Sequence, residues 1–187
     1  LSRQEERTSA LVAEVLSGLG LEVRSRVGGH GVVGLLRGGG GDGRTVALRA
    51  DMDALPVHED TGLPFASTVS GRMHACGHDA HTSMLLGAAR ILTAHRSALK
   101  GAVKLIFQPS EETAAGALAM IEDGVMENPK VDAFIGLHTG NFWTGVDAGG
   151  IGYSNGPLMA AADLFTITIT GKGGHGATPH RTIDPIA

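Results

Sequence analysis

The sequence has little of several residue types, and each shortage excludes a class of protein. A single cysteine, Cys76, among 187 residues excludes an internal disulfide framework and indicates a reducing compartment such as the cytoplasm. Lys and Arg (15) do not outnumber Asp and Glu (19), so the net charge of -4 offers no basic excess for nucleic acid or anionic lipid. No apolar run approaches the roughly 18 residues that span a bilayer. The sequence therefore predicts a protein that works neither on nucleic acid nor in a membrane.

Two residue types are abundant instead. Glycine occurs 29 times, about double its usual share of roughly 7%, and predicts many tight turns. Nine histidines stand beside an aromatic content of only 4%, and indicate chemistry. An apolar content of 42% with 18% charged residues is typical of a globular chain.

The first part of the chain predicts one helix and two short strands. Apolar residues at helical spacing predict a helix over 2–19, which begins with a capping box formed by Ser2 and Glu5. Residues 22–27 and 32–37 are typical of strands, and the glycine run that follows them predicts a hairpin connection to the next strand. A phosphate loop is not favoured there, because neither Lys-Ser/Thr nor a helix follows.

Strands and helices then alternate along the chain. We expect strands over 45–50, 102–107 and 132–137, separated by helices over 79–95 and 114–122. This order predicts an α/β fold, with a mostly parallel sheet flanked by helices.

The pattern changes after a second glycine-rich stretch. Residues 164–170 (LFTITIT) alternate with period two, which is typical of a half-exposed strand. We therefore expect two domains, 1–161 and 162–187. We also expect the chain to be a piece of a longer protein, because a helix is predicted at its start and another plausible helix start lies at its end.

Polar side chains follow three of the predicted strands at their carboxyl ends. These side chains are Asp51 and Asp53, then Glu111 and Glu112, then His138. Because ligands bind beyond the carboxyl ends of strands in open α/β sheets, we expect these groups to converge on one crevice.

A histidine-rich segment, 74–81 (HACGHDAH), leads into the helix that follows it. Cys76 and His78 are separated only by Gly77, whose conformational freedom would let both side chains turn toward one centre. Together with the carboxylates, these imidazole and thiolate groups suit Zn, Mn, Co or Ni rather than Mg or Ca. Of two adjacent glutamates, one can bind a metal while the other serves as a base toward water.

Each of these signals also has an ordinary structural explanation. A Glu-Glu pair is most often a solvated helix start, and a lone cysteine is usually a small buried side chain. Asp51 and Asp53 could cap a loop, and residues 173–176 (GGHG) could form a simple turn. Only the convergence of several signals favours a metal site.

Five segments of the chain together resemble a known family. They are LRADMDALP (48–56), MHACGHDAHT (73–82), LIFQPSEE (105–112), GLH (136–138) and GKGGHGATPH (171–180). In their order and spacing the first four resemble the M20 metallopeptidase family, and within it the branch of N-acyl-amino-acid, hippurate and auxin-conjugate amidohydrolases. The fifth is similar to the start of that family's lid, or dimerisation, domain.

The resemblance implies a zinc-peptidase-like catalytic domain with two divalent metal ions and an N-acyl amino acid as substrate. It assigns Glu111 as the general base and His175 as the lid histidine that stabilises the oxyanion, often in the site of a partner subunit. It assigns four metal ligands, which are Cys76, His78, Glu112 and His138. It further implies a homodimer formed through the lid, and a fifth protein ligand, a histidine that we expect beyond residue 187.

Two further residues are candidates for holding the ligands in place. Asp53 and His81 could orient the metal-binding imidazoles, as carboxylates and other outer groups do in metal sites. A loop cap and an ordinary histidine at a helix start are equally good explanations of them.

Two rival functions stay open at this point. A nucleophilic hydrolase built on Cys76 and a histidine would leave both glutamates and His138 unexplained. A binding protein that has lost catalysis would not need Glu111.

Overall fold

The structure is a computed structural model that describes residues 1–140, 145–161, 163 and 165–186. The chain forms two compact units, Leu1–Thr144 and Gly145–Ala187. The domain boundary expected near residue 162 stays a prediction.

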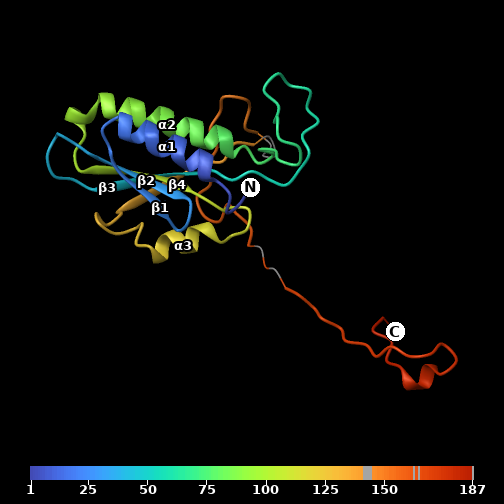
Figure 1. The fold of residues 1–187 in the computed structure, drawn as a ribbon. Helices are drawn as coiled ribbons and strands as arrows, with labels where there is room; N and C mark the ends of the chain where they lie inside the picture. The colour runs from blue at the N-terminus through green and yellow to red at the C-terminus, as the bar shows by residue number, and fades with distance from the viewer. Residues whose placement is uncertain (141–144, 162, 164, 187) are drawn as a thin grey trace. The chain divides into compact units, whose positions relative to one another are not determined.

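The first unit is built on a mixed sheet of five strands with the order β1-β2-β4-β3-β5 (Figure 1). The strands are β1 (Glu22–Val27), β2 (Gly31–Arg37), β3 (Thr45–Asp51), β4 (Ala102–Gln108) and β5 (Ala133–Gly136). β3 pairs in parallel with both β4 and β5, while β1 and β2 form an antiparallel hairpin that joins the sheet at β4. The parallel arrangement predicted for 45–137 is therefore confirmed, and it places the carboxyl ends of three strands at one edge.

Helices cover both faces of this sheet. α1 (Glu6–Gly18) and α2 (His78–Ala94) lie side by side on one face, and α3 (Gly116–Glu122) lies on the other (Figure 1). A short 3-10 helix, η1 (Arg96–Ala98), follows α2.

β4 shows how the sheet divides the core into two layers. Leu105 and Phe107 pack into the cluster that contains the buried residues of α1 and α2. Ile106, which lies between them in sequence, packs instead with Met120 of α3. This alternation follows from the period of two in a strand, and it buries β4 on both faces from Lys104 to the residues that follow the strand.

The predicted start of the first helix was wrong. α1 begins at Glu6, and no side chain caps it. The Ser2 hydroxyl instead donates a hydrogen bond of 2.7 Å to Asp53 Oδ2, and Glu5 accepts bonds from Ser110. The spacing of a capping box was present, but both side chains have tertiary partners that outcompete the cap.

The glycine run 38–43 was also misinterpreted. It joins β2 to β3, but β4 lies between these strands, so they do not form a hairpin. The run packs against the segment that leads into β4: Gly38 and Gly40 donate backbone hydrogen bonds of 2.8 Å to Gly101 and Leu99. A side chain at Gly38 would place its Cβ 2.1 Å from the Leu99 carbonyl oxygen, so the glycine serves a close approach of two backbones.

The second unit has little regular structure among its described residues. It contains a 3-10 helix, η2 (Pro179–Arg181), and an isolated antiparallel bridge between Lys172 and Ile183. Of the predicted strand 164–170, residue 164 lies outside the described residues and 165–170 form no strand. Across the described part of the whole chain, no helix has the length and apolarity needed to cross a membrane.

Candidate metal centre

Gly77 sets the direction of the two donors that flank it. It stands at the N-cap of α2 with φ +80°, a left-handed conformation that L-residues with a Cβ rarely adopt. A Cβ here would also lie 2.4 Å from Thr139 Oγ1. The predicted use of Gly77 is therefore seen in its backbone, and it brings Cys76 and His78 into one group of donor atoms.

His78 is the central side chain of the site and is 1% exposed. Its Nδ1 lies 2.9 Å from the Asp53 backbone carbonyl oxygen and 3.3 Å from the Asp53 carboxylate. Nδ1 therefore carries the hydrogen and donates a hydrogen bond to Asp53, which leaves a lone pair on Nε2 of the neutral ring. Nε2 lies 3.8 Å from an oxygen of Glu111 and 3.8 Å from an oxygen of Glu112.

Two buried atoms of this group lack a hydrogen bond. They are His78 Nε2 and Glu112 Oε1. Buried polar atoms in native proteins are nearly always hydrogen-bonded, so an unpaired imidazole nitrogen facing an unpaired carboxylate oxygen needs an explanation. A divalent cation between them would satisfy both, and the residues present therefore fit a metal ion.

A second group of donors adjoins the first through His78. Cys76 Sγ lies 3.4 Å from His138 Nε2, and His138 Nδ1 donates to the Thr139 carbonyl oxygen at 2.6 Å. Donor atoms of Cys76, His78 and His138 all lie within 4.8 Å of one another, and so do those of His78, Glu111 and Glu112. The structure thus brings together the four predicted ligands and the predicted base.

The electrostatics of the site are those of a negative pocket. Burial and the negative charges of Glu112 and Glu111 raise the pKa of the Cys76 thiol to about 11. Burial opposes protonation of His78, but the hydrogen bond to Asp53 and the nearby carboxylates outweigh it and raise the pKa of His78. The carboxylates thus contribute an upward shift to both groups, and the negative charge that causes it also favours a metal dication.

Asp53 connects His78 to the turn that carries both glutamates. Its carboxylate accepts the backbone N–H groups of Glu111 and Glu112, each at 3.1 Å, in addition to the Ser2 hydroxyl. Burial alone would raise the pKa of Asp53, but these hydrogen bonds and the one to His78 hold it well below its usual range. Asp53 is therefore ionised and fixed, as a residue that orients His78 must be; this role stays a prediction.

His81 belongs to a hydrogen-bonded line beside the donors. Its Nδ1 donates to Asp51 Oδ1 at 2.6 Å, and its Nε2 accepts the Thr139 backbone N–H at 2.8 Å. Asp51 Oδ2 in turn accepts from Arg49 at 2.7 Å. Although Asp51, His78 and His81 are close enough to hold a metal, the atoms of Asp51 and His81 are thus already paired. The line fixes Thr139, whose carbonyl oxygen orients the ring of His138.

Four residues of this arrangement were not recognised as part of the site from the sequence alone. Arg49 and Thr139 were not singled out, and Ser2 and Glu5 were assigned to a cap. Arg49 carried a usable signal, because it is a charged residue within the otherwise apolar strand TVALRA (45–50). Thr139 carried none, because a threonine after His138 is unremarkable in a sequence.

His175 lies in the second unit and its side chain is exposed. Its Nδ1 accepts the Ala177 backbone N–H at 3.1 Å, which holds the local turn. The role assigned to it by the resemblance stays a prediction.

Comparison with known proteins extends this picture. The family described as peptidase family M20/M25/M40 matches residues 47–183. Thermostable carboxypeptidase 1 of Saccharolobus solfataricus is 51% identical over 100% of this chain and 47% of its own length. The N-acyl-L-amino acid amidohydrolase of Geobacillus stearothermophilus is 48% identical over 100% of this chain and 49% of its own length. The chain thus spans about half the length of these relatives.

A solved structure supports the same relationship. The Bacillus subtilis YXEP protein, described as a dinuclear metal binding peptidase from the M20 family, superposes with a TM-score of 0.70. It is 45% identical, and the match covers 75% of this chain and 38% of that protein. With the family's pattern spread over most of the sequence, this chain belongs to peptidase family M20/M25/M40.

Proposed function

We propose that the protein carrying this chain is a metal-dependent amidohydrolase that hydrolyses the amide bond of N-acyl amino acids. The observation that carries the proposal is the buried pair of atoms His78 Nε2 and Glu112 Oε1, 3.8 Å apart and without hydrogen bonds, beside a second carboxylate. The printed names of the relatives, which include an N-acyl-L-amino acid amidohydrolase, support it.

The residues that would hold two divalent ions are Cys76, His78, Glu112 and His138. Sulfur, nitrogen and oxygen donors together favour Zn, Mn, Co or Ni. When bound, such ions supply Lewis acidity and lower the pKa of water from 15.7 toward roughly 7. Because the pKa of Cys76 is about 11 without a metal, loading the site displaces the thiol proton.

The protein's own residues then move the protons. The Glu111 carboxylate lies 3.8 Å from His78 and its backbone is fixed by Asp53. It takes a proton from the attacking water and delivers it to the nitrogen of the departing amino acid. His175 serves as a donor to the developing oxyanion, and one such donor is worth about 3–4 kcal/mol.

The rival cysteine hydrolase is not favoured by the electrostatics. A nucleophilic cysteine needs a lowered pKa and a positive neighbour, whereas Cys76 has a pKa raised to about 11 by burial and two carboxylates. A catalytically silent binding protein would retain no need for Glu111, which is placed beside the donors.

A carboxypeptidase reaction is a second candidate, favoured by the relative that is named as a carboxypeptidase. Both reactions break an amide bond on the amino side of a terminal amino acid. They differ in the group on the carbonyl side, which is a simple acyl group in one case and a peptide in the other.

The test uses the natural gene product, purified and loaded with Mn²⁺ or Zn²⁺. We expect it to release amino acid from N-acetyl- and N-benzoyl-amino acids, and to lose this activity on chelation. Blocked dipeptides assayed in parallel decide between the two candidates. The proposal is wrong if metal-loaded protein cleaves neither class, or if Glu111→Gln cleaves them as fast as wild type.

Two further expectations belong to the same proposal. We propose that the whole protein forms a homodimer through its lid domain, which sedimentation or light scattering would test. We also propose that it works in the cytoplasm, because its single cysteine fits a reducing compartment.

A further inference from the structure

Two buried carboxylates hold the turn that carries the base and the ligand. Three successive backbone N–H groups point at them: that of Ser110 donates to Glu5 Oε1 at 2.8 Å, and those of Glu111 and Glu112 donate to Asp53 at 3.1 Å each. Asp53 was expected near the site. Glu5 is 105 residues away from Ser110 in sequence.

Glu5 is an unusual residue to find in this place. It is 3% exposed, and among the described residues no Lys, Arg or His forms an ion pair with it. Its Oε1 accepts the backbone N–H of Arg3 at 3.1 Å and lies 3.4 Å from Ser110 Oγ, while its Oε2 is buried without a hydrogen bond. Burying a carboxylate is costly, and here no cation offsets the cost. Such a residue is expected to serve a specific site rather than general stability.

The turn needs to be held because its backbone is strained. Ser110 has φ +53°, in the left-handed region that a residue with a Cβ rarely adopts. This conformation turns the chain between the end of β4 and α3 so that the three N–H groups reach Glu5 and Asp53. Without an acceptor for the Ser110 N–H, the turn would relax and move Glu111 and Glu112.

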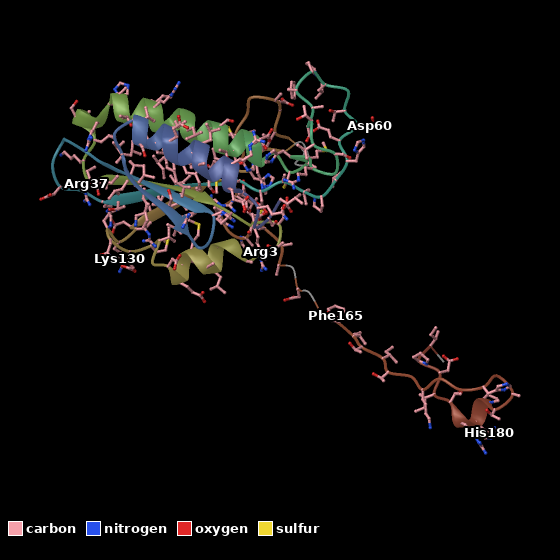
Figure 2. The ribbon with its side chains drawn as sticks, viewed as in Figure 1. Arg3, Arg37, Asp60, Lys130, Phe165 and His180 are labelled. Atoms are coloured by element: carbon pink, nitrogen blue, oxygen red, sulfur yellow. The ribbon has the colours of Figure 1, made fainter. Side chains whose placement is uncertain are left out.

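The N-terminal segment reinforces this contact from the same side. Ser2 donates its hydroxyl to Asp53 Oδ2 at 2.7 Å, and Arg3 donates its backbone N–H to Ser110 Oγ at 3.0 Å. Figure 2, where Arg3 is labelled, shows this segment at the end of the sheet beside the start of α3. Residues 2–5 thus supply one of the two carboxylates that hold the turn, Glu5, and contact the other, Asp53, through Ser2.

We propose that Glu5 is a positioning residue for the catalytic pair Glu111 and Glu112. It acts through the backbone of Ser110, touches neither metal nor substrate, and fixes the distance of both carboxylates from His78. This inference rests on the amidohydrolase function proposed above.

The chain offers a matched control beside it. Glu6 has the same charge and is the next residue, but its side chain is 67% exposed and its ion-pair partner is His30 at 3.6 Å. A second control is Val12 of α1, which is fully buried in the core between this helix and the sheet. Val12→Ala lowers stability without touching the turn, so it separates positioning from a general loss of fold.

The experiment compares these variants in the full-length, Mn²⁺-loaded enzyme. Glu5→Ala is expected to lower kcat at least tenfold with KM within threefold, and to weaken Mn²⁺ binding about 10- to 100-fold, as loss of outer groups does in metal sites. Glu5→Gln keeps an oxygen for the Ser110 N–H and is expected to recover most of both properties. Glu6→Ala and Val12→Ala are expected to retain wild-type kcat and Mn²⁺ affinity, although Val12→Ala has a lower Tm.

The inference is overturned if Glu5→Ala keeps wild-type kcat and Mn²⁺ affinity. It is also overturned if Val12→Ala, with a Tm no lower than that of Glu5→Ala, loses as much kcat and Mn²⁺ affinity as Glu5→Ala does. If Glu5→Ala does not fold, Glu5→Asp decides: it keeps the charge but is one methylene too short, so it should bind Mn²⁺ more weakly than Glu5→Gln. Equal binding by the two would contradict the inference. Mn²⁺ titration calorimetry needs no substrate, so it still tests Glu5 if the wild-type protein proves inactive on every amide.

Discussion

At the scale of single residues, the candidate metal ligands lie beside several carboxylates. His78 Nε2 and Glu112 Oε1 are buried, Cys76 beside them is half-buried, and the pKa values of His78 and Cys76 are both shifted upward. Each shift alone has an ordinary cause. The buried and unpaired atoms His78 Nε2 and Glu112 Oε1 at the same place are what favour a divalent cation.

Glu111 and Glu112 are adjacent, yet we expect opposite effects of replacing them. Glu111→Gln removes the base and should lower kcat at least about a hundredfold while metal content stays near wild type. Glu112→Ala removes a ligand and should lower the metal content itself. Steady-state kinetics together with elemental analysis of both variants measure this. Ordinary turnover by Glu111→Gln would show that the base is wrongly assigned.

Cys76 gives a prediction that depends on pH. In metal-free protein its pKa of about 11 keeps the thiol protonated at neutral pH, so alkylation should be slow and should rise about tenfold per pH unit until pH approaches 11. A bound metal coordinates the sulfur as a thiolate and should protect it from alkylation throughout this pH range. Iodoacetamide labelling from pH 7 to 10, with and without chelator, measures both effects. Equal rates with and without chelator would exclude Cys76 as a ligand.

At the scale of helices and strands, Lys104 links β4 to the segment after α3. Its Nζ is buried and donates to the carbonyl oxygens of Val125, Glu127 and Pro129 at 2.8–2.9 Å. Burial lowers the pKa of Lys104, but three acceptors around one ammonium group offset the burial of its charge. The contact ties α3 and its following turn to the sheet.

Lys104→Met is therefore expected to destabilise the fold although it introduces an apolar residue into an apolar layer. Loss of charge-assisted hydrogen bonds and the unpaired carbonyls should lower the free energy of unfolding by about 2–4 kcal/mol. Urea denaturation measures the change. Lys100→Met, at an exposed position near the start of the same strand, serves as control and should stay within about 0.5 kcal/mol. The interpretation fails if both variants unfold at the same urea concentration.

The regular elements were predictable because local pattern and packing agree in them. The strand over 22–27 matches its predicted bounds, and α2 begins and ends within one residue of the predicted helix. Ser2, Glu5 and the glycine run 38–43 were misread because their partners are 51 to 105 residues away in sequence. A rule based on spacing detects only residues that are close in sequence. Asp53, Ser110 and Leu99 come close to Ser2, Glu5 and the glycine run only in the folded sheet, where β4 lies between β2 and β3.

The candidate site was predictable for a different reason. Parallel strands bring their carboxyl ends to one edge, so Asp53, Glu111 and His138 had to meet once the order of elements was known. What surrounds them did not follow from this rule. The orientation of His138 depends on Thr139 and His81, and such hydrogen bonds are decided by side-chain geometry rather than by residue type.

At the scale of the whole molecule, β5 shows that the described sheet has an open edge. All four of its residues are exposed, and Phe134 and Ile135 are each 50% exposed. An apolar strand at a sheet edge favours association with another strand. The relatives that this chain matches are about twice its length, so further sequence is available in them to cover such an edge.

We therefore expect the 187-residue chain, expressed alone, to be inactive as an amidohydrolase. Four candidate ligands would have to serve two metals, whereas a catalytic metal usually has three protein ligands and a water. Among the described residues after 145, regular structure is limited to η2 and one isolated bridge, and ordering such a segment costs about 1–2 kcal/mol per residue in backbone entropy. Weak or single binding of Mn²⁺, measured by calorimetry, should accompany the absence of turnover on acetyl- and benzoyl-amino acids. Turnover at the rate of a full-length relative, absent from a Glu111→Gln control prepared in the same host, would show that Cys76, His78, Glu112 and His138 suffice for catalysis.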